Sequence, residues 1–238
     1  FNMVDLKNAE LIIGAISLFV SYLFSVSFSG WFRAWAASAV GDSTGKQLGF
    51  MTLNPLVHID FVGVILLFLI KFGWGAHVPI NPFNITYPRR NLKLFFAYLS
   101  DALAHFVLAI VALFFLVVFF GLNALHVSIP IMLSGVLSFP SFASRFPDIS
   151  SLSIVVILIM VFAIYLNMIL GVLYLIYNSF LCLFYIFYGE TIYLSGKKIY
   201  LIFVPLLFAI FFAYPLRKYF LYMIYLLGCY WASFLGIS

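Results

Sequence analysis

The stretch from Gly41 to Gly63, GDSTGKQLGFMTLNPLVHIDFVG, is the most informative polar run in a chain that is otherwise strongly apolar. The segments on both sides of it have the length and composition of membrane spans. Polar backbone groups at membrane depth must find partners inside the protein. We therefore expect this stretch, called the polar block below, to lie at a membrane surface or in a cavity sheltered by the spans. It is the first candidate for a functional site.

The composition predicts an integral membrane protein. Of the 238 residues, 66% are hydrophobic and 8% are charged, whereas soluble domains are about 45–50% apolar and about 25% charged. The net charge of +5 lies mostly in short clusters between the expected spans, where Lys and Arg set membrane topology. Membrane lipid is therefore the expected surrounding, and nothing in the charge distribution indicates nucleic acid as a partner.

Six membrane spans are predicted, because a helix that crosses the hydrocarbon core needs about 20 apolar residues. They lie at about 11–40, 61–75, 94–121, 153–188, 199–214 and 219–236. A break near Gly171 would divide the fourth segment into two short helices. The predicted fold is an all-α polytopic membrane protein with a single domain, 1–238. Its core lies at about 11–188, and two C-terminal helices follow at about 199–236.

Two segments between these spans are predicted to be loops. Residues 72–90, FGWGAHVPINPFNITYPRR, contain Pro79, Pro82 and Pro88 and cannot form a helix interior. They predict a short extended excursion or a re-entrant hairpin. Residues 121–152 are rich in Ser and Pro, and their apolar patch at 129–137 is suited to a re-entrant or interfacial helix.

The polar block resembles the segment that follows the zinc-binding helix in the bacterial site-2 protease family of intramembrane metalloproteases. The family pattern is roughly G-D-x-T-A-K-x-x-G-R-L-T-L-N-P-L-x-H-x-D-P-x-G, and this chain departs from it at Gly45, Phe50, Met51 and Phe61. Residues 72–82 resemble a second family segment, F-G-W-A-K-P-V-P-V-N-P, which helps to dock extended substrates by strand addition. The matching residues are Gly41, Asp42, Thr44, Lys46, Gly49, Thr52, Leu53, Asn54, Pro55, Leu56, His58, Asp60 and Gly63 in the first segment, and Phe72, Gly73, Trp74, Val78, Pro79, Asn81 and Pro82 in the second.

The resemblance implies a site-2-protease-like fold but also a degenerate zinc site. Active members hold zinc with two His one helical turn apart and an Asp from a later span, and a Glu between the two His acts as general base. Counting back from Gly41 places the His, Glu and His positions on Ser29, Gly30 and Arg33. The later Asp position falls on Ile186. We therefore expect no catalytic residue, no metal and no cofactor at these positions.

Arg33, Asp101 and His105 form a predicted buried polar cluster. Asp101 and His105 are one turn apart on the third expected span, and Arg33 is on the first. A charged side chain inside a span costs free energy and is normally paired. In the resembling family the position of Arg33 carries a zinc ligand and that of Asp101 a Gly. We predict that Arg33 lies within ion-pair distance of Asp101, with His105 nearby. A fixed positive charge would then take the place of the metal ion. Asp42 and Asp60 are the alternative partners of Arg33.

The retained motif residues are predicted to support the fold or a binding surface. We expect either that Asn54 and Asp60 accept hydrogen bonds from backbone N–H groups or that Asp42 and Thr44 cap local turns. His58 is expected to make a structural hydrogen bond. The full set is Gly41, Asp42, Thr44, Asn54, Pro55, His58, Asp60, Pro79 and Asn81.

These observations lead to three functional hypotheses. The first is a catalytically inactive, site-2-protease-like protein of the bacterial inner membrane that binds a transmembrane protein partner as a subunit or scaffold of an assembly. The second is an active intramembrane metalloprotease with relocated ligands, namely Asp101, His105 and His58. The third is a transporter or channel subunit in which Arg33, Asp101 and His105 line a polar path.

Overall fold

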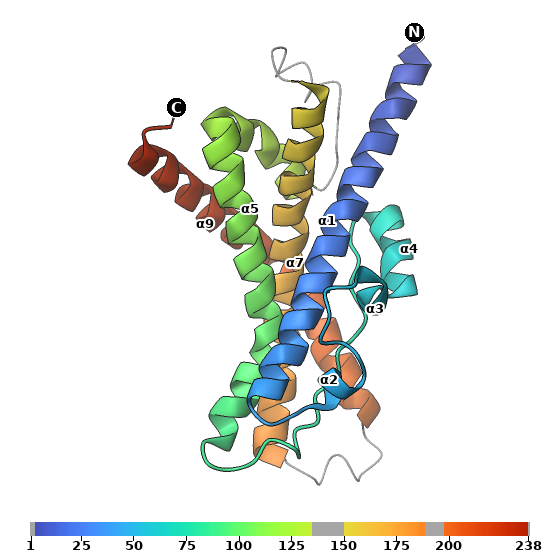
Figure 1. The fold of residues 1–238 in the computed structure, drawn as a ribbon, viewed down its shortest axis with the longest axis vertical. Coiled ribbons are helices and arrows are strands. Elements are labelled where there is room, and N and C mark those ends of the chain that lie inside the picture. The colour runs from blue at the N-terminus through green and yellow to red at the C-terminus, as the bar shows by residue number, and fades with distance from the viewer. Residues whose placement is uncertain (1–2, 135–149, 189–197, 238) are drawn as a thin grey trace.

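The computed structural model describes the backbone of residues 3–134, 150–188 and 198–237. Within these ranges the side chains are described except at 3–10, 131–134, 151, 188, 198–215 and 217. Four long helices dominate the structure (Figure 1), and three short ones lie between the first two of them. In chain order the helices are α1 (Met3–Ala39), α2 (Thr44–Gln47), α3 (Pro55–His58), α4 (Phe61–Ile70), α5 (Arg90–Ser134), α7 (Ser151–Tyr188) and α9 (Lys198–Leu235).

The described part of the chain is all-helical, as the composition predicts. It contains no β-strand, and its one sheet-like feature is an isolated antiparallel bridge between Ile59 and Gly75. Three of its helical segments are long and apolar enough to cross a membrane, which indicates a membrane protein. These segments are Leu11–Ala39, Arg90–Pro130 and Leu152–Phe187.

The predicted spans at 61–75 and at the C-terminus take a different form in the structure. Helix α4 has 10 residues and a length of about 15 Å, which is half of the hydrocarbon thickness of about 30 Å. It ends at Lys71, whose left-handed φ of 60° starts an irregular segment. At the C-terminus, one continuous helix, α9, covers the region where two helices were expected.

Helices α5 and α7 also differ from the predicted boundaries. Helix α5 continues beyond residue 121 to Ser134, with a kink at Gly121, where φ is 74°. Part of the predicted loop 121–152 is therefore helical, and residues 135–149 lie outside the described residues. Helix α7 is unbroken at Gly171, where an added Cβ would lie 2.9 Å from the Phe106 ring. This glycine allows close packing of α7 against α5 and does not divide the helix.

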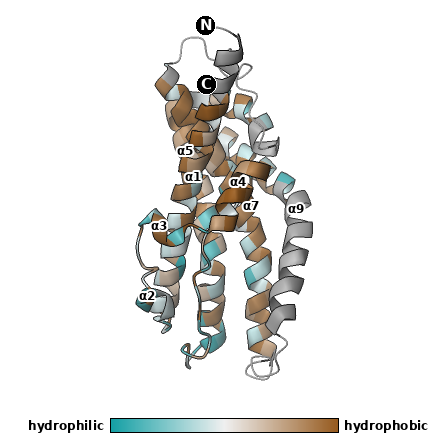
Figure 2. Cartoon of the chain, turned by 90° about the vertical axis from the view of Figure 1, so that its right-hand side faces the viewer, coloured by the Kyte–Doolittle hydropathy of each residue, from teal (hydrophilic) through white to brown (hydrophobic). Residues whose placement is uncertain are grey.

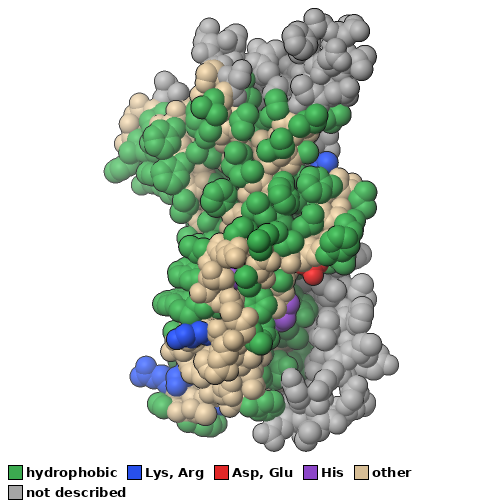
Figure 3. All heavy atoms as spheres, turned by 45° about the vertical axis from the view of Figure 1, so that its right-hand side comes forward, with side chains coloured by type: hydrophobic (Ala, Val, Ile, Leu, Met, Phe, Trp, Pro, Cys, Tyr) green, Lys and Arg blue, Asp and Glu red, His purple; other side chains and the backbone are tan. Residues whose placement is uncertain are grey.

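Helices α1, α5 and α7 pack together around a continuous apolar core (Figure 1). The core contains fully or almost fully buried side chains from all three helices, such as Leu18, Leu113 and Leu158. In Figure 2 most described residues of the long helices are coloured hydrophobic, and hydrophilic colouring is more frequent toward the end of the bundle beside α2 and α3. In Figure 3 hydrophobic side chains cover much of the visible described surface, as expected of helices that face lipid.

The segment between α4 and α5 is extended, as its prolines predict, and it runs beside α1 toward the start of α5 (Figure 1). Several hydrogen bonds attach it to α1 and to the residues that follow α1. The Tyr22 hydroxyl donates to the Trp74 carbonyl at 2.9 Å, and Arg33 Nε donates to the Val78 carbonyl at 3.0 Å. Further along, the Asn81 backbone N–H donates to Asp42 Oδ2 at 2.7 Å. This segment, residues 71–89, is called the excursion below.

The polar block is ordered by its own hydrogen bonds, as predicted. Asn54 caps α3 by accepting from the Leu56 N–H at 3.1 Å, and Asp60 caps α4 by accepting from the Gly63 N–H at 2.8 Å. Asp42 is fully buried and accepts from the Thr44 backbone N–H at 3.1 Å. The Asp42 carboxylate therefore forms hydrogen bonds both within the polar block, to Thr44, and to the excursion, at Asn81.

The cap of α4 gives a direct test of this support role. We expect Asp60→Ala to lower the free energy of unfolding by about 0.5–2 kcal/mol, because the N-terminal N–H groups of α4 lose their acceptor. Asp60→Asn is the matched control, since its amide oxygen can still accept the same bond. Thermal unfolding of both variants in detergent measures the difference. Equal stability of the Ala variant and the wild type would contradict the support role.

Candidate functional site

Ser29, Gly30 and Arg33, the three positions that the resemblance assigns to the zinc motif, lie on α1, on the side that packs into the bundle. Ser29 is 5% exposed and Arg33 is 2% exposed. Ser29 Oγ makes only a long contact of 3.4 Å to the Val26 carbonyl, within its own helix. The site is therefore buried where the resemblance places it, and Ser29 offers a single hydroxyl in place of an imidazole.

Gly30 stands against the ring of His58. An added Cβ at Gly30 would lie 2.2 Å from His58 Nδ1 and 2.6 Å from Cε1. The ring is held there because Nε2 lies 2.8 Å from the Thr52 carbonyl and donates its proton to it. Nδ1 has no hydrogen-bond partner within the described part of the chain. The imidazole of His58 thus fills the space in which the side chain of a general-base Glu would begin.

Arg33 pairs with Asp101, which confirms the predicted contact. Its Nη1 lies 3.3 Å from Asp101 Oδ2, and both side chains are at most 10% exposed. The guanidinium carbon also lies 5.9 Å from the centre of the Tyr98 ring, at a distance that permits a cation–π interaction. Together with the bond to the Val78 carbonyl, these contacts hold one cation at the intersection of α1, α5 and the excursion.

His105 continues the cluster on the next turn of α5. Its Nε2 lies 3.8 Å from Asp101 Oδ1, and its Nδ1 lies 2.7 Å from Asn167 Oδ1 on α7. The Tyr174 ring stacks on the imidazole with 5.4 Å between the ring centres. All described contacts of His105 are therefore to groups inside the bundle, where it is 1% exposed.

The polar cluster extends further than the sequence predicts. Asn167 donates to Ser25 Oγ at 2.8 Å, and Ser25 donates to the Ser21 carbonyl at 2.7 Å. Ser21 in turn contacts the Ile159 carbonyl of α7. One signal was available in advance, because Ser17, Ser21, Ser25 and Ser29 recur every four residues and so share one face of α1. Asn167, a single amide in an apolar helix, gave no periodic signal.

The residues present do not fit a catalytic zinc site. Such a site needs three protein ligands, usually His with Glu or Asp. Within the described ranges, no group of three or more His, Cys, Asp or Glu side chains is close enough to hold a metal ion. His58 lies against Gly30 and does not complete a ligand set with Asp101 and His105. Ile186 packs with the apolar cluster around Leu94 and provides no ligand.

His77 lies on the excursion, outside the spans. Its side chain reaches the surface, although the surrounding protein still desolvates it. This desolvation, followed by the positive charge of Arg33, lowers the pKa of His77 to about 4. His77 is therefore neutral at pH 7 and adds no second cation beside the Arg33–Asp101 pair.

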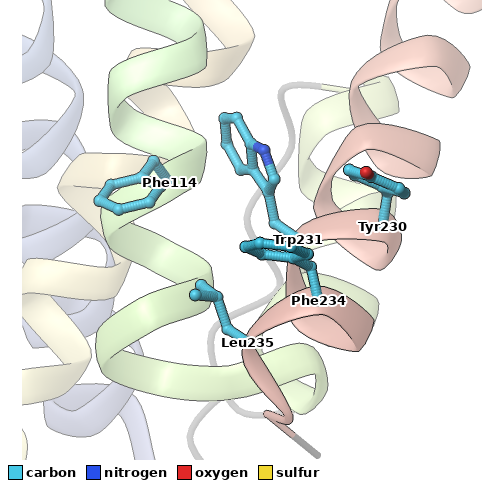
Figure 4. A pocket seen from close by; sticks show the side chains of 5 residues that line it. All are labelled: Phe114, Tyr230, Trp231, Phe234 and Leu235. Carbon is cyan, nitrogen blue, oxygen red and sulfur yellow. The ribbon is translucent and has the colours of Figure 1, made fainter.

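An apolar pocket of about 230 Å³ lies elsewhere, between α5 and the C-terminal part of α9 (Figure 4). Aromatic rings form most of its wall, and none of the polar cluster residues lines it. Its lining gives no basis for catalysis. The lining residues are Phe114, Tyr230, Trp231, Phe234 and Leu235.

Comparison with known proteins gives a partial similarity to a metalloprotease. A Bacillus subtilis (strain 168) protein named "Putative zinc metalloprotease YwhC" is 31% identical over 100 residues. The matched region covers 42% of this chain and 45% of the relative, so the chain spans less than half of that protein's length. No family model matches the chain, and no solved structure matches it. The similarity supports a relationship to site-2-protease-like zinc metalloproteases.

The buried ion pair leads to a specific stability prediction. Asp101→Asn should lower the free energy of unfolding by about 3–5 kcal/mol, because it leaves the Arg33 guanidinium buried without its counter-charge. The double change Arg33→Met with Asp101→Leu removes both charges and should cost less. Denaturant unfolding in detergent compares the variants. A double variant that is less stable than Asp101→Asn would contradict this account of the pair.

The contact between Gly30 and His58 leads to a second prediction. Gly30→Ala should destabilise the protein, because the new methyl group overlaps the imidazole and overpacking typically costs about 1–3 kcal/mol. Combining it with His58→Ala should recover part of that loss by removing the ring. A double-mutant cycle of thermal unfolding measures the coupling. If the two losses simply add, the two side chains do not compete for one space.

Proposed function

We propose that the protein is a catalytically inactive, site-2-protease-like membrane protein that acts as a binding or scaffold subunit in the bacterial inner membrane. The observation that carries this proposal is the Arg33–Asp101 ion pair at the position of a zinc ligand. Arg cannot lose its proton under physiological conditions and cannot ligate a metal. Its fixed positive charge also repels a cation.

The retained parts of the molecule support a binding role. The polar block and the excursion keep their order through the caps at Asn54 and Asp60 and through the buried carboxylate of Asp42. These are the two segments in which the chain resembles the site-2 proteases. A protein that lost its ligands but kept these segments retains a surface for a partner and lacks the groups for hydrolysis.

The excursion suggests how an extended partner would bind. The Ala76 N–H donates to the His58 carbonyl at 2.7 Å, and the Val78 carbonyl accepts from Arg33. In an extended chain successive residues direct their backbone groups to opposite sides, so the backbone groups of His77 point away from α1. A partner segment would add to this outer edge as a strand. Pro79 lies on the same outer edge two residues later but has no N–H. We therefore expect the His77 N–H to be the donor that binds the partner strand.

Two variants at this position test the binding role. His77→Pro removes the outer N–H and keeps an extended backbone, whereas His77→Ala removes only the side chain. Each tagged protein is purified from native membranes in mild detergent, and its co-purifying membrane proteins are quantified by mass spectrometry. We expect a transmembrane partner whose recovery falls roughly two- to tenfold with Pro, as for one lost hydrogen bond, and is unchanged with Ala. Equal recovery with both variants would contradict strand addition at this edge.

The other two hypotheses receive less support from the geometry. A metalloprotease with relocated ligands requires His58 beside Asp101 and His105, and the described residues contain no such cluster. A channel subunit requires a wet path along Arg33, Asp101 and His105. These side chains are 1–7% exposed and bond to one another and to neighbouring helices. We therefore do not propose either function.

A further inference from the structure

The orientation of the Asn167 amide is fixed by its neighbours on α1 and α7. Its Nδ2 donates to the Ala163 carbonyl at 2.8 Å and to Ser25 Oγ at 2.8 Å. A carbonyl oxygen can only accept a hydrogen bond, so exchanging the amide N and O atoms would place two acceptors against each other. Asn167 Oδ1 is therefore the atom that faces His105.

This orientation fixes the protonation of the His105 ring. Asn167 Oδ1 is an acceptor, so His105 Nδ1, at 2.7 Å from it, must carry a hydrogen. In a neutral imidazole the other nitrogen then has a lone pair and no hydrogen. That nitrogen, Nε2, is buried and has no hydrogen-bond partner among the described residues. It faces Asp101 Oδ1 across 3.8 Å, so two acceptors oppose each other.

We propose that Asp101 and His105 form a proton-binding site inside the helix bundle. A proton taken up from water would bind between His105 Nε2 and Asp101 Oδ1 and convert the opposed acceptors into a charge-assisted hydrogen bond. The cluster would then change from Arg33⁺ and Asp101⁻ with a neutral imidazole to the same pair with an imidazolium. No bond between heavy atoms forms or breaks in this step.

The charges around the imidazole determine when the proton binds. From α1 the cation Arg33 faces Asp101, and from α7 the neutral Tyr174 ring stacks on His105. From the excursion, the neutral His77 lies within electrostatic range of Arg33 and Asp101. Among the described residues of α9, Phe220 packs against Phe106, the neighbour of His105. Since Arg33 already neutralises Asp101, uptake of the proton would leave the cluster with one net positive charge.

The same network explains why the site would hold a proton and not conduct it further. Beyond His105 the next group is the amide of Asn167, whose two N–H donors are both used. An amide does not exchange protons as an imidazole or a carboxylate does. The hydrogen bonds that lead from Asn167 to Ser25 and Ser21 therefore hold the Asn167 amide in position. Proton transfer ends at His105.

Nitrogen-15 NMR of the histidine side chains tests this proposal. The full chain, labelled at its four histidines, is placed in lipid nanodiscs and titrated through the range of about pH 8 to 5 in which imidazoles change charge. The His105 signals are assigned with His105→Gln. We expect the form with hydrogen on Nδ1 alone at the upper end, and hydrogen on both nitrogens at the lower end while the protein stays folded. A ring that remains neutral at every pH at which the protein is folded would overturn the proposal.

Two further variants separate the proposed partners. With Asp101 replaced by Asn, an amide N–H can donate to Nε2, and no carboxylate remains to share an added hydrogen. The variant is made together with Arg33→Met, because Asp101→Asn alone leaves a buried cation unpaired. We expect less His105 with hydrogen on both nitrogens at the low end of the titration than in the wild type, and an equal amount would contradict the role of Asp101. Asn167→Leu removes the acceptor for Nδ1, so hydrogen should move to Nε2 at high pH, and an unchanged tautomer would contradict the assignment on which the site rests.

Discussion

The buried guanidinium of Arg33 is the constraint on which the rest of the bundle depends. A charge at this depth must be neutralised and hydrogen-bonded, and the protein meets this requirement from two different directions. Asp101 provides the counter-charge from α5 at 3.3 Å, and the Val78 carbonyl provides an acceptor from the excursion at 3.0 Å. Helix α1 is thereby held to α5 on one side and to the segment after α4 on the other.

The neighbouring positions on α1 are packed against other parts of the protein. The space in front of Gly30 is filled by the His58 ring. The carboxylate of Asp101, in turn, faces His105 with its second oxygen and connects the pair to Asn167 on α7. The result is a polar contact among the three helices α1, α5 and α7.

The sequence predicted the parts of the fold that depend on charge and on capping. The partner of Arg33 could be predicted because few carboxylates lie in the spans, and the caps at Asn54 and Asp60 follow from local spacing. The span predicted at 61–75 was wrong, because the apolar run continues beyond the last residue of α4, Ile70. At the C-terminus two spans were predicted at 199–214 and 219–236, but one helix, α9, covers both, since membrane helices tolerate Pro. The contacts of Asn167 and His58 depend on helix packing and had no signal in composition.

The most direct test of the central claim is the zinc content of the full-length chain. The protein is purified in mild detergent from cells grown with added zinc, washed with a weak chelator, and analysed for metal per chain by elemental analysis. If the Arg33 cation replaces the metal, zinc should be far below one ion per chain, and Asp101→Asn and His105→Gln should not change it. One zinc ion per chain that is lost in either variant would contradict the account, because it would show that these residues hold a metal and not a fixed cation.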